Sequence, residues 1–270
     1  MNKDLDFEEK HKEDLERLRN LRLLDNDFMT KVFEDTKCAE FLLQIILKRN
    51  DLKVTESTSQ YGIKNLQGRS VRLDILAVDQ QNHVYNIEIQ RSDHGAGVKR
   101  ARYNSSLIDA KATEPGEQYE ALNESYVIFI TENDVLGKGL PIYHIERMVT
   151  ETGEPFGDEE HIVYVNSQIK DETSLGMLMH DFACTEAKDM FYQVLADRVR
   201  YFKEDEKGVT IMCKAMEDMR NEARAEGSRE NAIRSAREMI KDGELSYEKI
   251  AQYSGLTIDE VRALATKQPA

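Results

Sequence analysis

The first part of the chain alternates between segments with the hydrophobic period of a helix and segments with that of a strand. Apolar residues at mostly helical spacing predict a helix over residues 21–47, and Gly95 and Gly97 open a second predicted helix that runs to Ala112. Runs rich in Val, Ile, Leu and Tyr predict strands. The predicted strands cover residues 52–66, 70–78, 83–89, 125–131 and 161–165. This order predicts an α/β domain, which a helix over residues 189–202 closes.

The composition changes after about residue 203. Residues 204–241 are rich in Glu, Lys, Arg, Ala and Met and contain no proline, which predicts a long, charged helical connector. We therefore expect three parts: the α/β domain over residues 1–203, this connector, and an all-α module over residues 242–270. The connector carries an apolar stripe of Ile211, Met212, Ala215 and Met219. The stripe would pack either on the first domain or on a second copy of the chain. In the second case the C-terminal helices would form a homo-oligomer.

The C-terminal module has the spacing of a helix-turn-helix. Ala251 permits close helix approach, Gly255 takes the turn, and Val261 fills the space between the helices. Ser246 and Thr257 can each cap a helix. The module is either a DNA reader or a small packing or protein-binding unit. The second helix would begin with two acidic residues, which repel phosphate and so count against DNA reading.

Composition limits the classes of protein that fit. A chain of 270 residues with 40% hydrophobic residues is long enough for one α/β core plus an appendage. The absence of an apolar run of 18 residues and a charged N-terminus predict that the chain is not a membrane protein. Cys38, Cys184 and Cys213 are few and far apart, which fits a reduced cytoplasm and excludes a cysteine-based zinc motif.

The formal net charge of −14 argues against a nucleic-acid partner, because it repels a polyanion at long range. The segment from residue 88 to residue 111 has the opposite balance. Its basic residues are Arg91, Lys99, Arg100, Arg102 and Lys111, against Glu88, Asp93 and Asp109. Since salt screens charges beyond about 8 Å, this local patch can dominate contact binding. We expect weak, salt-sensitive binding.

Two acidic residues face each other in a predicted hairpin. A turn centred on Gln81 joins the strands of residues 70–78 and 83–89 and sets Asp74 opposite Glu88, with their Cβ atoms roughly 4.5–5.5 Å apart. Opposed like charges destabilise a hairpin unless a cation neutralises them, and a hard divalent cation with oxygen ligands does so. The alternative is that the two residues decorate an exposed face of the hairpin.

A family resemblance adds to this interpretation. Asp74, a hairpin turn, Glu88-x-Gln90 and the helix-like segment of residues 98–106 together resemble the PD-(D/E)xK nuclease superfamily, and more narrowly the recombination-promoting nuclease (Rpn) or PD-(D/E)xK transposase family. Residues 25–34 and 126–139 also match, and the resemblance covers roughly residues 20–205. It implies a restriction-endonuclease-like core, in which helices flank a mixed central sheet, followed by an all-α C-terminal extension.

The resemblance implies that Asp74 and Glu88 bind Mg²⁺ or Mn²⁺, with the carbonyl of Ile89 as a third ligand. Glu34 on the first predicted helix is either a further carboxylate of the site or a solvated residue. Gln90 stands where the superfamily usually has a lysine. A lysine orients an attacking water and offsets developing charge, but a neutral amide only forms hydrogen bonds.

A neighbouring cation could replace the missing lysine. Arg91 follows directly but points away from Gln90 by strand alternation, so Lys99 and Arg102 on the next helix are the better candidates. Lys99 and Tyr103 are four residues apart and share a helix face, which resembles the Gln-xxx-Tyr motif of related exonucleases. We therefore include Gln90 and Lys99 in the expected catalytic set.

The implied function is a Mg²⁺-dependent DNA endonuclease linked to recombination. The expected DNA contacts are Arg91, Lys99, Arg100, Arg102 and Tyr103. The alternative is a non-catalytic DNA-binding or regulatory protein that retains the nuclease fold after losing the lysine. The two hypotheses differ on the metal, since the enzyme needs Asp74 and Glu88 to bind it and the binding protein does not.

Overall fold

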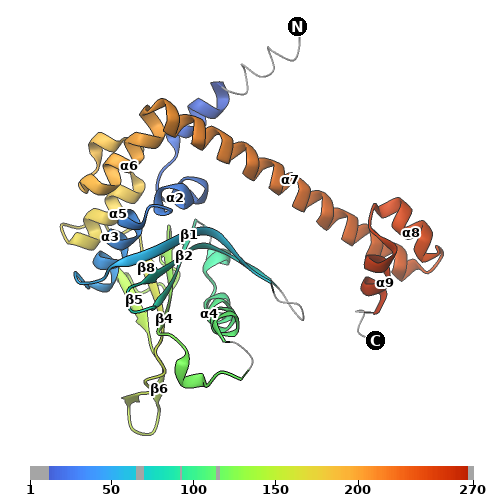
Figure 1. The fold of residues 1–270 in the computed structure, drawn as a ribbon, viewed down its shortest axis with the longest axis horizontal. Coiled ribbons are helices and arrows are strands. Elements are labelled where there is room, and N and C mark those ends of the chain that lie inside the picture. Colours follow the sequence, from blue (N-terminus) through green and yellow to red (C-terminus); the bar gives the residue numbers. More distant parts are fainter. Residues whose placement is uncertain (1–11, 65–69, 92, 114–115, 267–270) are drawn as a thin grey trace. The chain divides into compact units, whose positions relative to one another are not determined.

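The computed structural model describes residues 12–64, 70–91, 93–113 and 116–266 (Figure 1). The chain forms two compact units, Met1–Cys213 and Lys214–Ala270, and the boundary between them falls inside helix α7, Glu206–Asp242. The division into three parts expected from the sequence stays a prediction. No helix of the described residues is both long and apolar enough to cross a membrane.

A six-stranded mixed sheet forms the centre of the first unit. Its strands are β1 Val54–Ile63, β2 Val71–Asp79, β3 Val84–Gln90, β4 Ser125–Thr131, β5 Ile142–Ile145 and β8 Glu160–Asn166. The order is β1-β2-β3-β4-β8-β5, with β1, β2 and β3 antiparallel, β3, β4 and β8 parallel, and β5 antiparallel to β8. The expected mixed central sheet is confirmed. Strand β5 and the short hairpin of β6, Met148–Val149, and β7, Glu154–Pro155, were not predicted.

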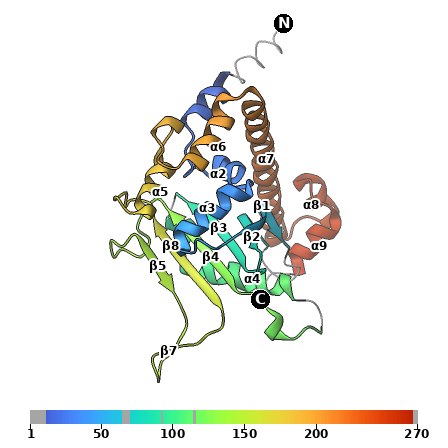
Figure 2. The ribbon, with the colours of Figure 1, turned by 60° about the vertical axis from the view of Figure 1, so that its left-hand side comes forward.

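Helices cover both faces of this sheet (Figures 1 and 2). They are α2 Asn26–Phe33, α3 Thr36–Leu47, α4 Val98–Ala112, α5 Ser174–Ala183 and α6 Gln193–Glu204. Helices α2 and α3 pack against β1, and α4 contacts β1, β2 and β4 from the other face. Val127, Ile128, Phe129 and Ile130 of β4 are all fully buried. Because consecutive strand residues point to opposite faces, β4 is a central strand covered on both sides.

The prediction of a single helix over residues 21–47 is wrong. The structure has two helices there, and α3 begins anew after Asp35. The side chain of Asp35 accepts a hydrogen bond from the backbone N–H of Lys37 at 2.9 Å. An aspartate in this position caps a new helix by satisfying an N–H group that has no partner inside the helix.

The closing helix begins later than the predicted residues 189–202. Helix α6 begins at Gln193, because Asp181 of α5 accepts the backbone N–H groups of Phe191 and Tyr192 at 2.8 and 2.9 Å. These bonds hold the segment before α6 against α5. Helix α5, which packs against α3, was not predicted.

In the second unit, α8, Tyr247–Ser254, and α9, Ile258–Thr266, share an apolar core with the C-terminal part of α7. The buried residues of this core are Ala236, Ile250, Leu256 and Val261. Gly255 ends α8 with φ of 74°, a left-handed conformation that glycine adopts without strain. Thr257 and Glu260 form reciprocal capping bonds of 2.9 and 3.3 Å. The predicted turn, caps and charged helix are confirmed.

Candidate active site

The hairpin of β2 and β3 has the predicted register. The carboxylate of Asp79 accepts the backbone N–H groups of Gln81 and His83 at 2.9 and 3.0 Å and so shapes the turn. The ladder ends at the pair of Ile75 with Ile87. Asp74 and Glu88 are the next residues on the two strands, so the turn brings them together as expected.

Asp74 and Glu88 are connected through hydrogen bonds at the end of this ladder. The backbone N–H of Asp74 donates to Oε1 of Glu88 at 3.3 Å, and the backbone N–H of Ile89 donates to Oδ2 of Asp74 at 3.2 Å. Asn26, the first residue of α2, donates its amide to Oδ1 of Asp74 at 3.1 Å. Asp74 is 6% exposed and Glu88 is 0% exposed, so the alternative of a hairpin decorated on an exposed face is wrong.

The environment of the two carboxylates disfavours their charged forms. Burial, followed by the charge of Asp74, raises the pKa of Glu88 to about 7, although the nearby Arg100 guanidinium opposes this shift. Burial also raises the pKa of Asp74, against the hydrogen bonds from Ile89 and Asn26. Two buried carboxylates in contact are stabilised as anions only when a cation is close. Their hard oxygen donors fit a divalent ion such as Mg²⁺ or Mn²⁺.

Helix α4 contacts one oxygen of Glu88 directly and reaches the other through Asn86 of β3. Arg100 donates from Nη2 to Oε2 at 2.6 Å, and its Nη1 donates to the backbone carbonyl of Gly95 at 2.9 Å. Asn104, one helical turn further on, donates to Oδ1 of Asn86 at 3.2 Å, and Asn86 donates to Oε1 of Glu88 at 3.0 Å. Arg100 was expected to contact DNA, but its contact with Glu88 and the roles of Asn86 and Asn104 were missed. The four-residue spacing of Arg100 and Asn104 on α4 was the available signal.

Gln90 lies beside Glu88 and depends on a neighbouring glycine for its position. Its Nε2 is 3.5 Å from Oε2 of Glu88. A Cβ atom at Gly95 would lie 1.8 Å from Oε1 of Gln90, so only glycine leaves room for the amide in this position. Sequence reasoning treated Gly95 only as the opening of a helix.

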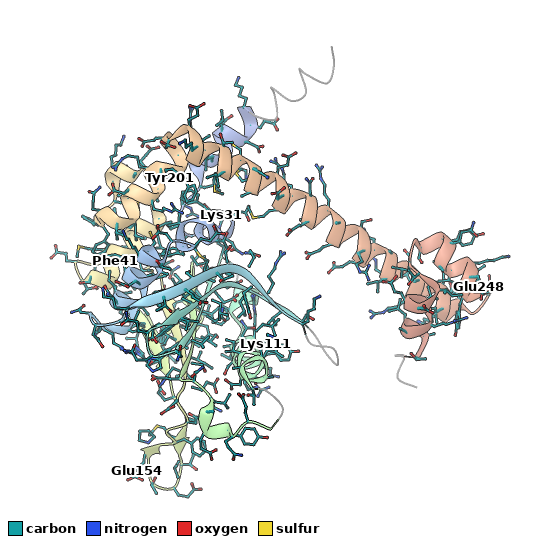
Figure 3. The ribbon with its side chains drawn as sticks, viewed as in Figure 1. Lys31, Phe41, Lys111, Glu154, Tyr201 and Glu248 are labelled. Atoms are coloured by element: carbon teal, nitrogen blue, oxygen red, sulfur yellow. The ribbon has the colours of Figure 1, made fainter. Side chains whose placement is uncertain are left out.

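A cavity of about 680 Å³ lies between the start of β2 and helix α4. The described residues that line it are Ser70, Val71, Arg72, Lys99, Arg100, Arg102, Tyr103 and Asn104. None of these is acidic, and four carry a positive charge. Because Arg100 both lines the cavity and contacts Glu88, it joins the cavity to the carboxylate pair. Helix α4 ends near Lys111, which is labelled in Figure 3 and does not belong to this lining.

Some of the cations expected to contact DNA line the cavity, and Arg91 does not. Lys99 and Tyr103 both line the cavity, in agreement with their predicted common helix face, as does Arg102. Arg72 was not predicted as a site residue. It stands two residues before Asp74, so strand alternation could have indicated that both side chains lie on the same face.

Arg91 and Glu34 have partners outside the cavity. Arg91 forms ion pairs with Asp25 at 2.8 Å and with Glu132 at 3.1 Å. Glu34 accepts from Lys31, labelled in Figure 3, at 2.7 Å and from the hydroxyl of Ser59. The charges of Arg91 and Glu34 are therefore balanced within the fold.

A second group of possible metal ligands, among the residues that the structure describes, is His180, Asp181 and Cys184, whose ligand atoms lie within 4.8 Å of one another. Both oxygens of Asp181 already accept backbone N–H groups, from Phe191 and Tyr192. Asp181 therefore shapes the chain between α5 and α6, and we assign no metal to this group.

The comparison with known families agrees with the geometry of the hairpin site. Residues 22–180 match the family described as PD-(D/E)XK nuclease family transposase. This range contains Asp74, Glu88 and the whole of α4. No curated protein and no solved structure matches the chain. Nucleases of this kind act on nucleic acid and generally use divalent metal ions. Since the match spans more than half of its residues, the chain belongs to the PD-(D/E)XK nuclease family transposases.

Proposed function

We propose that the protein is a metal-dependent DNA endonuclease of the Rpn type, which hydrolyses phosphodiester bonds in an active site formed by Asp74 and Glu88. The observation that carries this proposal is the junction of a buried carboxylate pair with a cation-lined cavity through Arg100. An acidic pair alone would serve many metal sites. An acidic pair that is joined through an arginine to a positively charged cavity suits a substrate with a polyanionic backbone.

Asp74 and Glu88 would hold Mg²⁺ or Mn²⁺, with the carbonyl of Ile89 as a further ligand. The bound ion would polarise a phosphate oxygen and lower the pKa of a water molecule. The chain's own contribution is to keep the two carboxylates buried and held in place, by the Asn26 amide on Asp74 and by the backbone N–H of Asp74 on Glu88. Rigid placement of this kind is what lets a site stabilise a transition state.

The cavity would bind the DNA backbone. Arg72, Lys99 and Arg102 offer positive charge to phosphates, and Tyr103 adds a hydroxyl and an aromatic ring. The net charge of −14 repels DNA at long range, but salt screens that repulsion beyond about 8 Å. Binding would therefore depend on these local contacts and weaken steeply as the salt concentration rises.

Arg100 would supply the positive charge that Gln90 lacks. A guanidinium stays charged at any pH at which the protein is folded and can donate two hydrogen bonds in a fixed geometry. Gln90 then has a different task, since its amide lies between Glu88 and Gly95. In this arrangement Gln90 would orient the attacking water by hydrogen bonding, and Arg100 would stabilise the developing charge on the phosphate.

A non-catalytic DNA-binding or regulatory protein is the second candidate. The observation that favours it is the 2.6 Å contact between Arg100 and Glu88, which neutralises one carboxylate without any metal. In that case the cavity would still bind DNA. A role in recombination, a homo-oligomer formed through the C-terminal helices and a cytoplasmic location complete the proposal and apply to both candidates.

The test is cleavage of supercoiled plasmid DNA by the purified protein in Mg²⁺ or Mn²⁺, with EDTA as the metal-free reference. We expect metal-dependent nicking or linearisation that is lost in Asp74→Asn and in Glu88→Gln. Asp197→Asn, which changes an exposed carboxylate on α6, is the matched control and should cleave like wild type. If wild type leaves the plasmid intact but binds DNA in EDTA, the enzyme proposal fails and the binding protein takes its place.

A further inference from the structure

Two buried asparagines link helix α4 to the inner oxygen of Glu88. Asn104 is 1% exposed and Asn86 is 0% exposed. The amide of Asn104 donates to Oδ1 of Asn86 at 3.2 Å, and the amide of Asn86 donates to Oε1 of Glu88 at 3.0 Å and to the backbone carbonyl of Ile75 at 3.4 Å. Asn104 lines the cavity, whereas Asn86 is not among the described residues that line it.

The direction of these hydrogen bonds follows from the chemistry of Glu88. An ionised carboxylate only accepts hydrogen bonds, so Asn86 must turn its NH₂ group toward Glu88. The carbonyl oxygen of Asn86 then faces α4 and needs a donor there. Asn104 provides that donor. A residue at position 104 that cannot donate would leave a buried carbonyl oxygen unsatisfied and would allow Asn86 to turn over, with its oxygen against the carboxylate.

We propose that Asn104 is a positioning residue, which acts through Asn86 to hold the Glu88 carboxylate in the orientation that binds metal. This inference rests on the proposed function. It differs from the role of Arg100, because the asparagines are neutral and so orient Glu88 without competing with a metal ion for its charge. Hydrogen-bond partners of a metal ligand typically contribute 10- to 100-fold to metal affinity.

The test is a double-mutant cycle on Mn²⁺ binding, measured by titration calorimetry without DNA. Asn104→Leu removes the donor, keeps the branched side-chain shape with the same number of heavy atoms, and adds no charge. We expect it to weaken Mn²⁺ binding by about tenfold with an unchanged circular-dichroism spectrum. Asn86→Leu should weaken binding at least as much, and the double variant should equal Asn86→Leu, since Asn104 acts only through Asn86. Asn104→Ala gives the same comparison if Asn104→Leu does not fold.

The matched control is Ser105→Ala. Ser105 is also buried in α4, at 2% exposed, but lies about 100° around the helix axis from Asn104. The Mn²⁺ affinity of Ser105→Ala should lie within about twofold of the wild-type affinity. Wild-type Mn²⁺ affinity in Asn104→Leu would overturn the positioning role alone. So would losses of Mn²⁺ affinity in the two single variants that simply add in the double variant. If wild type shows no Mn²⁺ binding that Asp74→Asn removes, the proposed function fails and this inference fails with it.

Discussion

Arg100 on α4 places Nη2 2.6 Å from Oε2 of Glu88 on β3, and the two residues are separated by a loop and a turn of 3-10 helix. The pair has unequal exposure, since Glu88 is fully buried and the side chain of Arg100 is 38% exposed. One end of the guanidinium therefore neutralises the inner carboxylate, and the outer part reaches the cavity. This geometry suits a cation that balances Glu88 in the resting site and contacts phosphate in the complex.

Replacement of Arg100 should separate metal binding from cleavage. In Arg100→Gln we expect plasmid cleavage to fall by about 10²-fold, because the charge that stabilises the transition state is lost. Mn²⁺ affinity should rise by about tenfold, because a cation that repels the metal is gone. Arg100→Lys keeps the charge and should lie between wild type and Arg100→Gln in both measurements. A parallel fall of affinity and cleavage in Arg100→Gln would contradict this division of roles.

The cavity cations should control DNA affinity and its dependence on salt. Lys99→Ala and Arg102→Ala should each weaken binding of a DNA duplex in EDTA and reduce the slope of log affinity against log salt by about 0.9. Arg91→Ala is the comparison, because the charge of Arg91 is already shared with Asp25 and Glu132, and its effect should be smaller. Fluorescence anisotropy at several salt concentrations measures both quantities. Equal slopes in all three variants would count against the cavity as the DNA site.

Gly95→Ala should displace Gln90 with little effect on stability. The added Cβ would lie 1.8 Å from the end of the Gln90 side chain, which can move at small cost. Because a displacement of about 1 Å at a reacting centre can lower the rate by up to about 10²-fold, we expect a clear loss of cleavage at an unchanged melting temperature. Gly97→Ala is the matched control, since nothing lies within 4 Å of its Cβ position. Similar losses in the two variants would show that the helix start, and not Gln90, was affected.

Asp79 should stabilise the hairpin in a pH-dependent way. Burial opposes its ionisation, but hydrogen bonds from the hydroxyl of Tyr85 at 2.7 Å and from the N–H groups of Gln81 and His83 outweigh it and lower the pKa of Asp79. A lowered folded-state pKa gives stability that is complete above the unfolded-state pKa of about 3.9 and is lost as the pH falls through the folded-state value.

The measurement is the free energy of unfolding of Asp79→Asn and wild type in urea. We expect Asp79→Asn to be less stable by about 1–3 kcal/mol at pH 7. The difference should shrink below about pH 4, because Asp79 then binds a proton in the unfolded chain before it does so in the folded protein. Asp51→Asn, an exposed residue near the same end of the sheet, serves as the control. A difference that stays constant from pH 7 to pH 3 would mean that the ionised form of Asp79 is not what stabilises the turn.

The residues that carried the fold prediction are those whose partners lie nearby in the sequence. The alternating strands and the polar turn around Gln81 set the register that brings Asp74 next to Glu88. Thr257 and Glu260 form their capping box within a single helical turn. Local hydrogen bonds and hydrophobic period decide such features, so the sequence alone was sufficient for them. The break at Asp35 was also local, but the strong apolar period across it concealed the cap.

The choice of partners around the carboxylates depended on tertiary structure. Lys99, Arg100 and Arg102 are neighbours on one helix, and the rotation of α4 against the sheet decides that Arg100 contacts Glu88. The same packing brings Asn104 to Asn86. The pairing of Arg91 with Asp25 spans 66 residues. Helix rotation and long-range pairing result from how the whole core packs, which the spacing of residues in one segment does not determine. The sequence by itself therefore determined the hairpin and its carboxylate pair, and only the tertiary structure decided which cation and which amides surround them.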